Sequence, residues 1–349
     1  VESGGPSPEQ LLAAKTGLAS VALISQGEQR ELPEADLLNT LDQWRPTLSQ
    51  TGELMALGVL YGTEEQQRRI CQYAVSLDEQ DDVARRAFVW LAGDSFRNGK
   101  DDAALAYIDR LTSGYGLTDK LGESLFDIGA ACAISQKWEA LDALTSRASS
   151  AAREVQNSPW VKAIPALRGI GAGDASTAQS CITALLEEHG TANNLLAEVI
   201  CSVGRAYEER GRLNLYDASR TDKAEFGVAV RIFERVVDEM SGVDRSRAMA
   251  LRELVICTSQ LDDHQKTIEY AEMLIAESPK DRFIPAANWF LARAYEALAQ
   301  DGKVALSDAD AGIRRACAGM LQSPQESWQI SAKTTLVCWT QYVAKGGVR

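Results

Sequence analysis

Two similar stretches of sequence decide the fold. Residues 204–211 read Gly-Arg-Ala-Tyr-Glu-Glu-Arg-Gly, and residues 291–298 read Leu-Ala-Arg-Ala-Tyr-Glu-Ala-Leu. With Tyr207 and Tyr295 as anchors, the equivalent positions of other segments are Ser95, Cys132, Gly169 and Thr258. Successive anchors are 37 or 38 residues apart, except for an interval of 51 residues after Tyr207. Because a fixed period of about 20 to 50 residues marks repeat architectures, we expect a chain of similar units.

Each anchor is followed by a second set of residues spaced four and then three apart, which is the spacing of one helix face. These sets are Ala104, Ile108 and Leu111; Ala140, Leu144 and Arg147; Ala178, Ile182 and Leu185; Ala229, Phe233 and Val236; Thr267, Ala271 and Leu274; and Ala309, Ile313 and Ala316. A small first residue lets the two helices of a pair approach, and the larger residues plug the next unit. Alternating runs bounded by hairpin turns, typical of β-strands, are missing from the sequence. The pattern therefore predicts an all-α fold of paired antiparallel helices.

These residues resemble the tetratricopeptide repeat (TPR) family. Its unit of about 34 residues is a helix pair with Trp-x-x-Leu-Gly-x-x-Tyr in the first helix, then Ala-x-x-x-Phe and a terminal Pro. The best-matching unit carries Val203, Gly204, Tyr207, Gly211, Ala229 and Phe233. The match is strongest over residues 192–300 and becomes periodicity alone over 80–190. The resemblance implies a divergent, right-handed α-solenoid of stacked antiparallel helix hairpins, whose core closes only by stacking.

We expect three segments along the chain. Residues 1–7 form a flexible linker, residues 8–323 the TPR-like array, and residues 324–349 a C-terminal capping helix and tail. Three aromatic side chains of the capping helix would cover the last hairpin; they are Trp328, Trp339 and Tyr342.

The long interval after Tyr207 indicates an insertion loop at residues 212–223. Long loops in compact arrays are commonly functional or mobile, so we expect this one to project from the stack and to assist partner binding. Its three large side chains would pack on a neighbouring helix; they are Leu213, Leu215 and Tyr216.

Composition narrows the function classes. The chain has 349 residues, 45% of them hydrophobic, which is ordinary for a folded protein and excludes disorder. The net charge of −13 disfavours nucleic acids and anionic lipid surfaces as partners. No run approaches the roughly 18 apolar residues that cross a bilayer, so we expect a soluble fragment without direct membrane insertion. It begins at Val1 rather than Met, which indicates trimming or processing.

The seven cysteines are odd in number and lie inside helical apolar patterns, so we interpret them as small buried side chains. Free thiols favour a reducing compartment such as the cytoplasm, while the periplasm and secretion stay open as alternatives. With only His189 and His264 as histidines, a zinc site would need scattered thiols. We therefore expect no metal site and no cofactor.

Other chemical motifs are weak. Residues 169–174 read Gly-Ile-Gly-Ala-Gly-Asp and superficially resemble a phosphate-binding loop, but without a preceding strand we expect an inter-helix turn. Residues 308–312 begin somewhat like a calcium loop, yet its twelfth position is Gly319, where a carboxylate is required. Adjacent carboxylates such as Asp81 and Asp82 are expected to cap helix starts rather than to catalyse.

The candidate binding residues are arginines and aromatics. In TPR stacks the first helix of each pair lines the concave surface, and the resemblance carries its exposed positions onto this chain. The resulting partner-binding set is Arg86, Arg97, Arg205, Arg252, Trp289 and Arg293. Phe96 would add a second aromatic, and Glu208 would also face the groove. Since arginine grips carboxylates bidentately, we expect an extended, acidic and partly apolar peptide as partner.

A second interpretation is that these arginines only form salt bridges with Glu208, Glu253 or Glu296 on solvated helix faces. The lysine and asparagine pattern of carboxylate-clamp TPR proteins is missing, so a chaperone C-terminus is not expected as partner. We expect a non-enzymatic protein-interaction scaffold. The alternatives are a structural subunit of a larger assembly, which would expose apolar surface at its ends, and an enzyme built on an α-solenoid.

Overall fold

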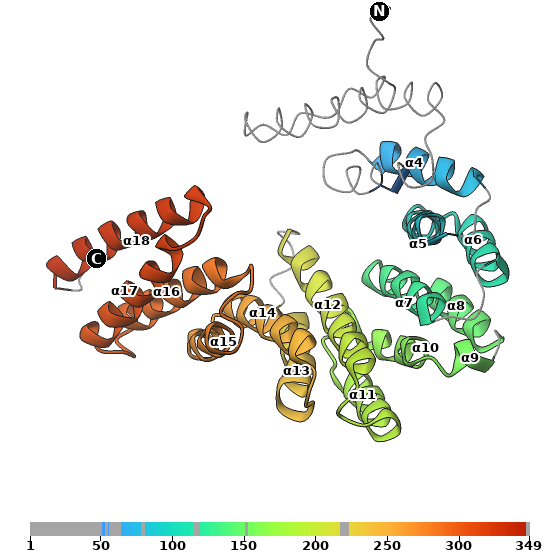
Figure 1. The fold of residues 1–349 in the computed structure, drawn as a ribbon. Coiled ribbons are helices and arrows are strands. Elements are labelled where there is room, and N and C mark those ends of the chain that lie inside the picture. The colour runs from blue at the N-terminus through green and yellow to red at the C-terminus, as the bar shows by residue number, and fades with distance from the viewer. Residues whose placement is uncertain are drawn as a thin grey trace, which may run out of the picture. The chain divides into compact units, whose positions relative to one another are not determined.

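The computed structural model describes residues 51–52, 55, 64–77, 81–114, 119–150, 153–216 and 223–346. Among these residues every regular element is a helix and none is a β-strand, which confirms the all-α prediction (Figure 1). The chain forms two compact units: an N-terminal unit of residues 1–132 and 139–155, and a C-terminal unit of residues 133–138 and 156–349. Each unit is a stack of helix hairpins and is described by itself.

The helices of the N-terminal unit are α4 (Glu64–Ser76), α5 (Asp82–Arg97), α6 (Asp101–Gly114), α7 (Asp119–Ile134), α8 (Trp138–Ser150) and α9 (Arg153–Gln156). The first helices α5 and α7 lie side by side, because Arg85 of α5 donates to the Ser124 hydroxyl of α7 at 2.6 Å. The second helices α6 and α8 are joined by an ion pair between Asp109 and Arg147 at 2.9 Å. The unit therefore repeats one hairpin next to another.

The helices of the C-terminal unit are α10 (Pro159–Ala163), the 3₁₀ helix η1 (Ile164–Gly169), α11 (Ser176–His189), α12 (Asn194–Tyr216), α13 (Ala224–Glu239), α14 (Asp244–Gln260), α15 (His264–Glu277), α16 (Ile284–Gln300), α17 (Leu306–Leu321) and α18 (Glu326–Ala344). From α12 onward each helix packs on the next one. Alternate helices also touch, so that α12, α14, α16 and α18 form one layer (Figure 1).

The residues of the repeat pattern form much of the core of both units. All the residues predicted on the second helices are buried, except Arg147, which forms the ion pair described above. Gly204 and Phe233 show why the pattern holds: a Cβ added at Gly204 would lie 2.7 Å from the Phe233 ring. Gly312 meets Tyr295 equally closely, at 2.5 Å. A missing side chain on one helix thus admits an aromatic ring from its partner.

Caps and turns end the helices as expected. The Asp81 carboxylate accepts from the Val83 amide at 3.1 Å, and Asp263 accepts from the Lys266 amide at 3.2 Å. Helix α11 stops at Gly190, whose φ of 76° is costly for other residues. The carboxylates at these helix starts therefore cap the free backbone amides of the first turn.

The repeat departs from the pattern in the pair that ends with α11. Its first helix is broken into the short helices α10 and η1, because Pro165 lacks the amide hydrogen that a continuous helix would need there, whereas Pro159 starts α10 at a position that tolerates proline. The Tyr207 hydroxyl donates to the Ala166 carbonyl of η1 at 2.8 Å and so joins the irregular segment to α12.

The predicted insertion loop at residues 212–223 is wrong over its first part. Residues 212–216 continue α12, and the side chains of Leu213 and Leu215 are 43% and 41% exposed rather than packed on a neighbouring helix. A 23-residue α12 explains much of the long anchor interval without a loop. The Tyr216 side chain and residues 217–222 lie outside the described part of the chain.

The predicted capping helix is α18. Trp339 is buried and its indole Nε1 donates to the Asp310 carboxylate of α17 at 2.9 Å, while its ring lies 5.3 Å from that of Tyr342. The linker at residues 1–7 and the start of the array at residues 8–50 lie outside the described residues. Continuity of one array across both units, and its right-handed coiling, stay predictions.

No helix in the described part of the chain combines the length and the apolar character needed to cross a membrane. None of the seven cysteines, all of them in the described part of the chain, forms a disulfide, and five of them are buried as expected. Cys181 is half-buried, and Cys338 on α18 is exposed.

Candidate partner-binding face

The candidate face of the C-terminal unit is the layer of first helices, α12, α14 and α16. Arg205 of α12 is half-exposed, and its Nε lies 3.4 Å from the Glu253 carboxylate of α14. Its guanidinium also contacts the Met249 sulfur on α14. Arg205 therefore spans two consecutive hairpins at the surface.

Arg293 and Trp289 lie one helix further along, on α16. Arg293 is exposed and donates to Glu296 on the same helix at 2.6 Å. Trp289 is half-buried and meets the edge of the Phe290 ring, with centroids 5.0 Å apart. The salt bridges expected with Glu253 and Glu296 are thus both formed, and both have one partner largely in solvent.

Arg252 is half-buried, and its guanidinium is held by a nearly buried carboxylate. Its Nε donates at 3.0 Å to the carboxylate of Asp281, and a second guanidinium nitrogen contacts the same oxygen. The Asp281 side chain is only 7% exposed and also accepts from the Phe283 amide at 2.8 Å. Arg252 therefore fastens the turn before α16 to α14.

Arg86 and Arg97 lie in the N-terminal unit, both on α5. The Arg86 guanidinium is 3.4 Å from Asp82, one helical turn away. Arg97 lies over the Trp90 ring, 5.9 Å from its centroid, and 3.8 Å from the Asp94 carboxylate. The two arginines share a helix, whereas Arg205, Arg252, Trp289 and Arg293 share the other unit.

Phe96 corrects the prediction of a second groove aromatic. The side chain is completely buried in the core of the N-terminal unit and offers nothing to a partner. Phe96 directly follows the buried anchor Ser95, and the exposed face of α5 is reached one residue later, at Arg97.

Glu208 corrects the prediction of an acidic residue facing the groove. Predicted to face the groove, it is only 3% exposed and accepts from Arg212 at 2.6 Å. It also shares a hydrogen bond with Glu253. Burial, and then the neighbouring Glu253 charge, raises the pKa of the Glu208 carboxyl to about 7. The signal was present, because Glu208 directly follows the anchor Tyr207 and precedes Arg212 by one helical turn.

Two backbone amides of the glycine-rich turn at residues 169–174 are already bound to a carboxylate of the protein itself. The buried Glu225 carboxylate of α13 accepts from the amides of Gly171 and Gly173 at 2.9 and 3.0 Å. These are backbone amides that a phosphate would need as donors. The loop is therefore an inter-helix turn, as expected, and an internal carboxylate fills its anion site.

The calcium-like segment is helical, because residues 308–312 lie inside α17. A calcium loop needs an irregular backbone that wraps around the ion, so this segment cannot form one. No group of three or more potential metal ligands occurs among the residues that the structure describes.

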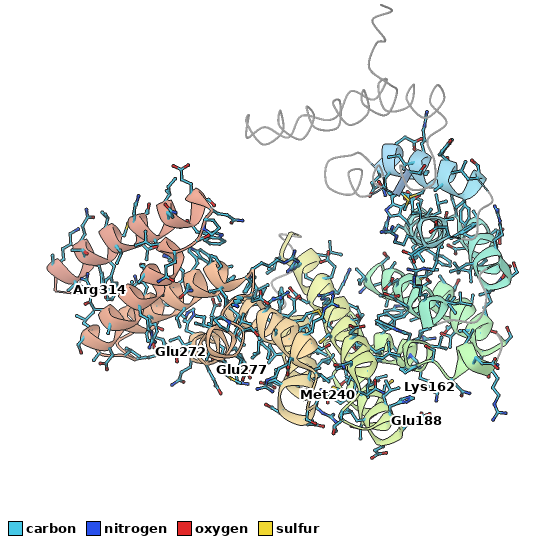
Figure 2. The ribbon with its side chains drawn as sticks, in the orientation of Figure 1. Lys162, Glu188, Met240, Glu272, Glu277 and Arg314 are labelled. Carbon is cyan, nitrogen blue, oxygen red and sulfur yellow. The ribbon has the colours of Figure 1, made fainter. Side chains whose placement is uncertain are left out.

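Ion pairs also cover surfaces outside the candidate face, and Figure 2 labels both partners of one of them, Lys162 and Glu188. Glu277 of α15 accepts from Arg247 at 2.7 and 3.0 Å, and Arg314 of α17 donates to Asp310 at 2.8 Å. Lys162 of α10 pairs with Glu188 of α11. Arginines inside and outside the candidate face thus pair with carboxylates. Arg205 and Arg293 differ from the others only in lying on the first-helix layer.

The fold defines a class: in its described residues the chain is an all-α protein of consecutively packed helix hairpins, and its likeness to the TPR unit is one of sequence pattern. No protein-family model matches the sequence, and no curated protein matches it at a significant level. Among solved structures it is similar to the TPR domain of P58(IPK), with 13% identity and a TM-score of 0.30, over 98% of this chain and 94% of that one. An overlap this loose says nothing about function, and the assignment rests on the packing of the hairpins.

Proposed function

We propose that the chain is a non-enzymatic scaffold that binds a protein partner on the first-helix layer of its C-terminal unit. The contact of α12 with α14 and of α14 with α16 supports this proposal more than any other observation. Through these contacts the first helices of three repeats form one continuous surface. Solenoid proteins bind their partners on extended surfaces of this kind. Arg205, Arg293 and Trp289 are the groups on that surface suited to a ligand.

The ligand is an extended peptide with carboxylates and at least one large apolar side chain. The guanidinium groups of Arg205 and Arg293 are about half exposed, so a peptide carboxylate can add to each of them while Glu253 and Glu296 stay in place. Trp289 offers ring surface to an apolar side chain. Arg252 is left out of the binding set, since releasing it would free the buried Asp281 carboxylate.

The test uses a display library of peptides rich in Asp, Glu and aromatic residues, with binding of a selected peptide measured by calorimetry at fixed salt. The variant is Arg205→Ala/Arg293→Ala, and the matched control is Arg314→Ala, an equally exposed arginine with an ion pair on a second helix. We expect the double variant to lose about 1 to 3 kcal/mol of binding free energy and the control to lose almost none.

Circular dichroism should show that both variants keep their helices. An unchanged affinity in the double variant, or a selected peptide that maps to α13, α15 or α17, would exclude this face. Binding should also weaken as salt rises, because the charge pairs are close to solvent.

A second candidate is a structural subunit of a larger assembly. One observation favours it, namely that Ile330 and Val337 of the terminal helix α18 are 54% and 57% exposed. Apolar surface at the end of a stack is the feature expected of an assembly subunit.

A further inference from the structure

A hydrogen-bonded pair of carboxyl groups lies between α12 and α14. The Glu208 side chain of α12 is 4% exposed, the Glu253 side chain of α14 is 15% exposed, and the two share a hydrogen bond. An ionised carboxylate can only accept hydrogen bonds, so this bond requires a proton on one of the two groups. While the bond is formed, the pair therefore carries one negative charge rather than two.

Two arginines of α12 flank the carboxyl pair, and each is held by one member of it. Arg205 lies 3.4 Å from the Glu253 carboxylate, and Arg212 donates to Glu208 at 2.6 Å. The two guanidinium groups are 49% and 46% exposed, so each can accept a further partner from solvent. They are about two helical turns apart and so lie on the same side of α12. Arg212 thus adds a second cation beside Arg205.

Other ionisable groups also surround this part of α12; they are Glu209 of α12 itself, Cys257 of α14, Glu225 of α13 and Asp174 before α11. Glu209 is exposed and acts on Arg212. Burial keeps the pKa of the Cys257 thiol well above its ordinary value, so the thiol stays neutral. The charges of Glu225 and Asp174 act on the Tyr207 hydroxyl. The carboxyl pair is therefore the group whose charge changes directly beside Arg205 and Arg212.

We propose that the proton shared by Glu208 and Glu253 controls how strongly Arg205 and Arg212 attract a peptide carboxylate, a regulation that rests on the function proposed above. With the proton in place, the two arginines exceed the pair by one positive charge, which favours an acidic peptide. When the proton passes to the buffer, the two carboxylates balance the two arginines. Because burial and the Glu253 charge raise the pKa of Glu208 to about 7, the affinity should fall as pH rises through neutrality.

The test is calorimetry of peptide binding at fixed salt, from about pH 5.5 to 8.5. The probe is an acetylated peptide selected from the display library and free of His, so that its own charge is constant over this range. We expect the dissociation constant of the wild type to rise about three- to tenfold with pH, because one negative charge is added beside the binding arginines. Glu208→Gln leaves one negative charge at every pH and should bind throughout as the wild type binds in acid.

Proton uptake is the second readout. A peptide that prefers the protonated pair must draw a proton from the buffer when it binds near neutral pH. Binding heats in two buffers of different ionisation enthalpy should therefore show uptake by the wild type and none by Glu208→Gln. The matched control is Glu209→Gln at the exposed neighbouring residue, and it should keep both the uptake and the pH dependence. Circular dichroism at each pH checks that the variants stay folded.

The outcomes separate this inference from the proposed function. A wild-type dissociation constant that does not change with pH, or proton uptake that persists in a folded Glu208→Gln variant, would overturn the inference. The proposed function still stands in that case if Arg205→Ala/Arg293→Ala weakens binding. A peptide that binds this double variant as tightly as the wild type at every pH would overturn both, because it does not use the first-helix layer.

Discussion

At the scale of the residue, a glycine facing an aromatic ring sets how closely two helices of a hairpin approach. Gly204 faces Phe233, and a methyl group at this place would lie 2.7 Å from the ring. We expect Gly204→Ala to lower the free energy of unfolding by about 1 to 3 kcal/mol, because the ring must move against a packed core. Urea denaturation measures this change.

Gly227 of α13 provides a control with the opposite sign. A Cβ there meets nothing within 4 Å, so Gly227→Ala should only remove backbone freedom from the unfolded chain and stabilise by about 0.5 to 1 kcal/mol. Equal effects of the two substitutions would show that helix propensity rather than the ring contact governs position 204.

The raised pKa of Glu208 makes stability depend on pH near neutrality. The unfolded carboxyl has an ordinary pKa of 4.5 and the folded one a pKa of about 7, so the folded state binds more protons between these values. The stabilisation from this group is therefore complete in acid and is lost as pH rises through about 7. We expect Glu208→Gln, which stays uncharged beside Glu253, to flatten the decline of unfolding free energy between about pH 5 and 8 by 1 to 3 kcal/mol.

The same pH series on Glu209→Gln provides the comparison, because Glu209 is an exposed neighbour on α12. A decline that persists unchanged in Glu208→Gln would mean that another group carries the proton.

At the scale of the element, the second helices could be predicted from the sequence and the first helices only in part. The spacing of four and three identifies a second helix, because its inner face is apolar along its whole length, as at Ala178, Ile182 and Leu185. The first helices touch both neighbours and the surface, so their burial changes within one residue, as Phe96 and Glu208 show. Hence the sequence predicts the hairpins better than the candidate site.

Pairing between distant residues explains the remaining errors at the site. Arg252 and Asp281 are 29 residues apart, and nothing in the local pattern indicates that the turn before α16 brings them together. The break before α11 is different, since Pro165 marks in the sequence the point at which the helix ends and η1 begins.

The Glu225 carboxylate links two elements, because it joins α13 to the turn before α11. Glu225→Ala would leave the amides of Gly171 and Gly173 without their acceptor, and we expect a loss of about 1 to 3 kcal/mol in urea denaturation. Glu225→Gln keeps one acceptor oxygen and should lose less. Added phosphate should not restore the wild-type stability if the turn is only structural, and a full rescue would revive the phosphate-loop interpretation.

At the scale of the whole molecule, hairpins that contact mainly their neighbours make stability a local property. In such stacks the free energy is close to a sum of repeat terms and neighbour interfaces. The completely buried Phe233 lies between α12 and α13, so Phe233→Ala opens a cavity in one hairpin. We expect a loss of about 3 to 5 kcal/mol there, with the effect passing to α14 and α15 through their shared interfaces.

Native-state hydrogen exchange by mass spectrometry distinguishes this behaviour from global unfolding. Exchange should rise most in α12 and α13, less in α14 and α15, and not at all in α5 and α6, which belong to the other compact unit. The same substitution type in the N-terminal unit, Phe126→Ala, should give the reverse pattern, because Phe126 is equally buried there. A uniform rise across both units in either variant would mean that the chain unfolds as one cooperative body, and the neighbour-limited picture of the array would then be wrong.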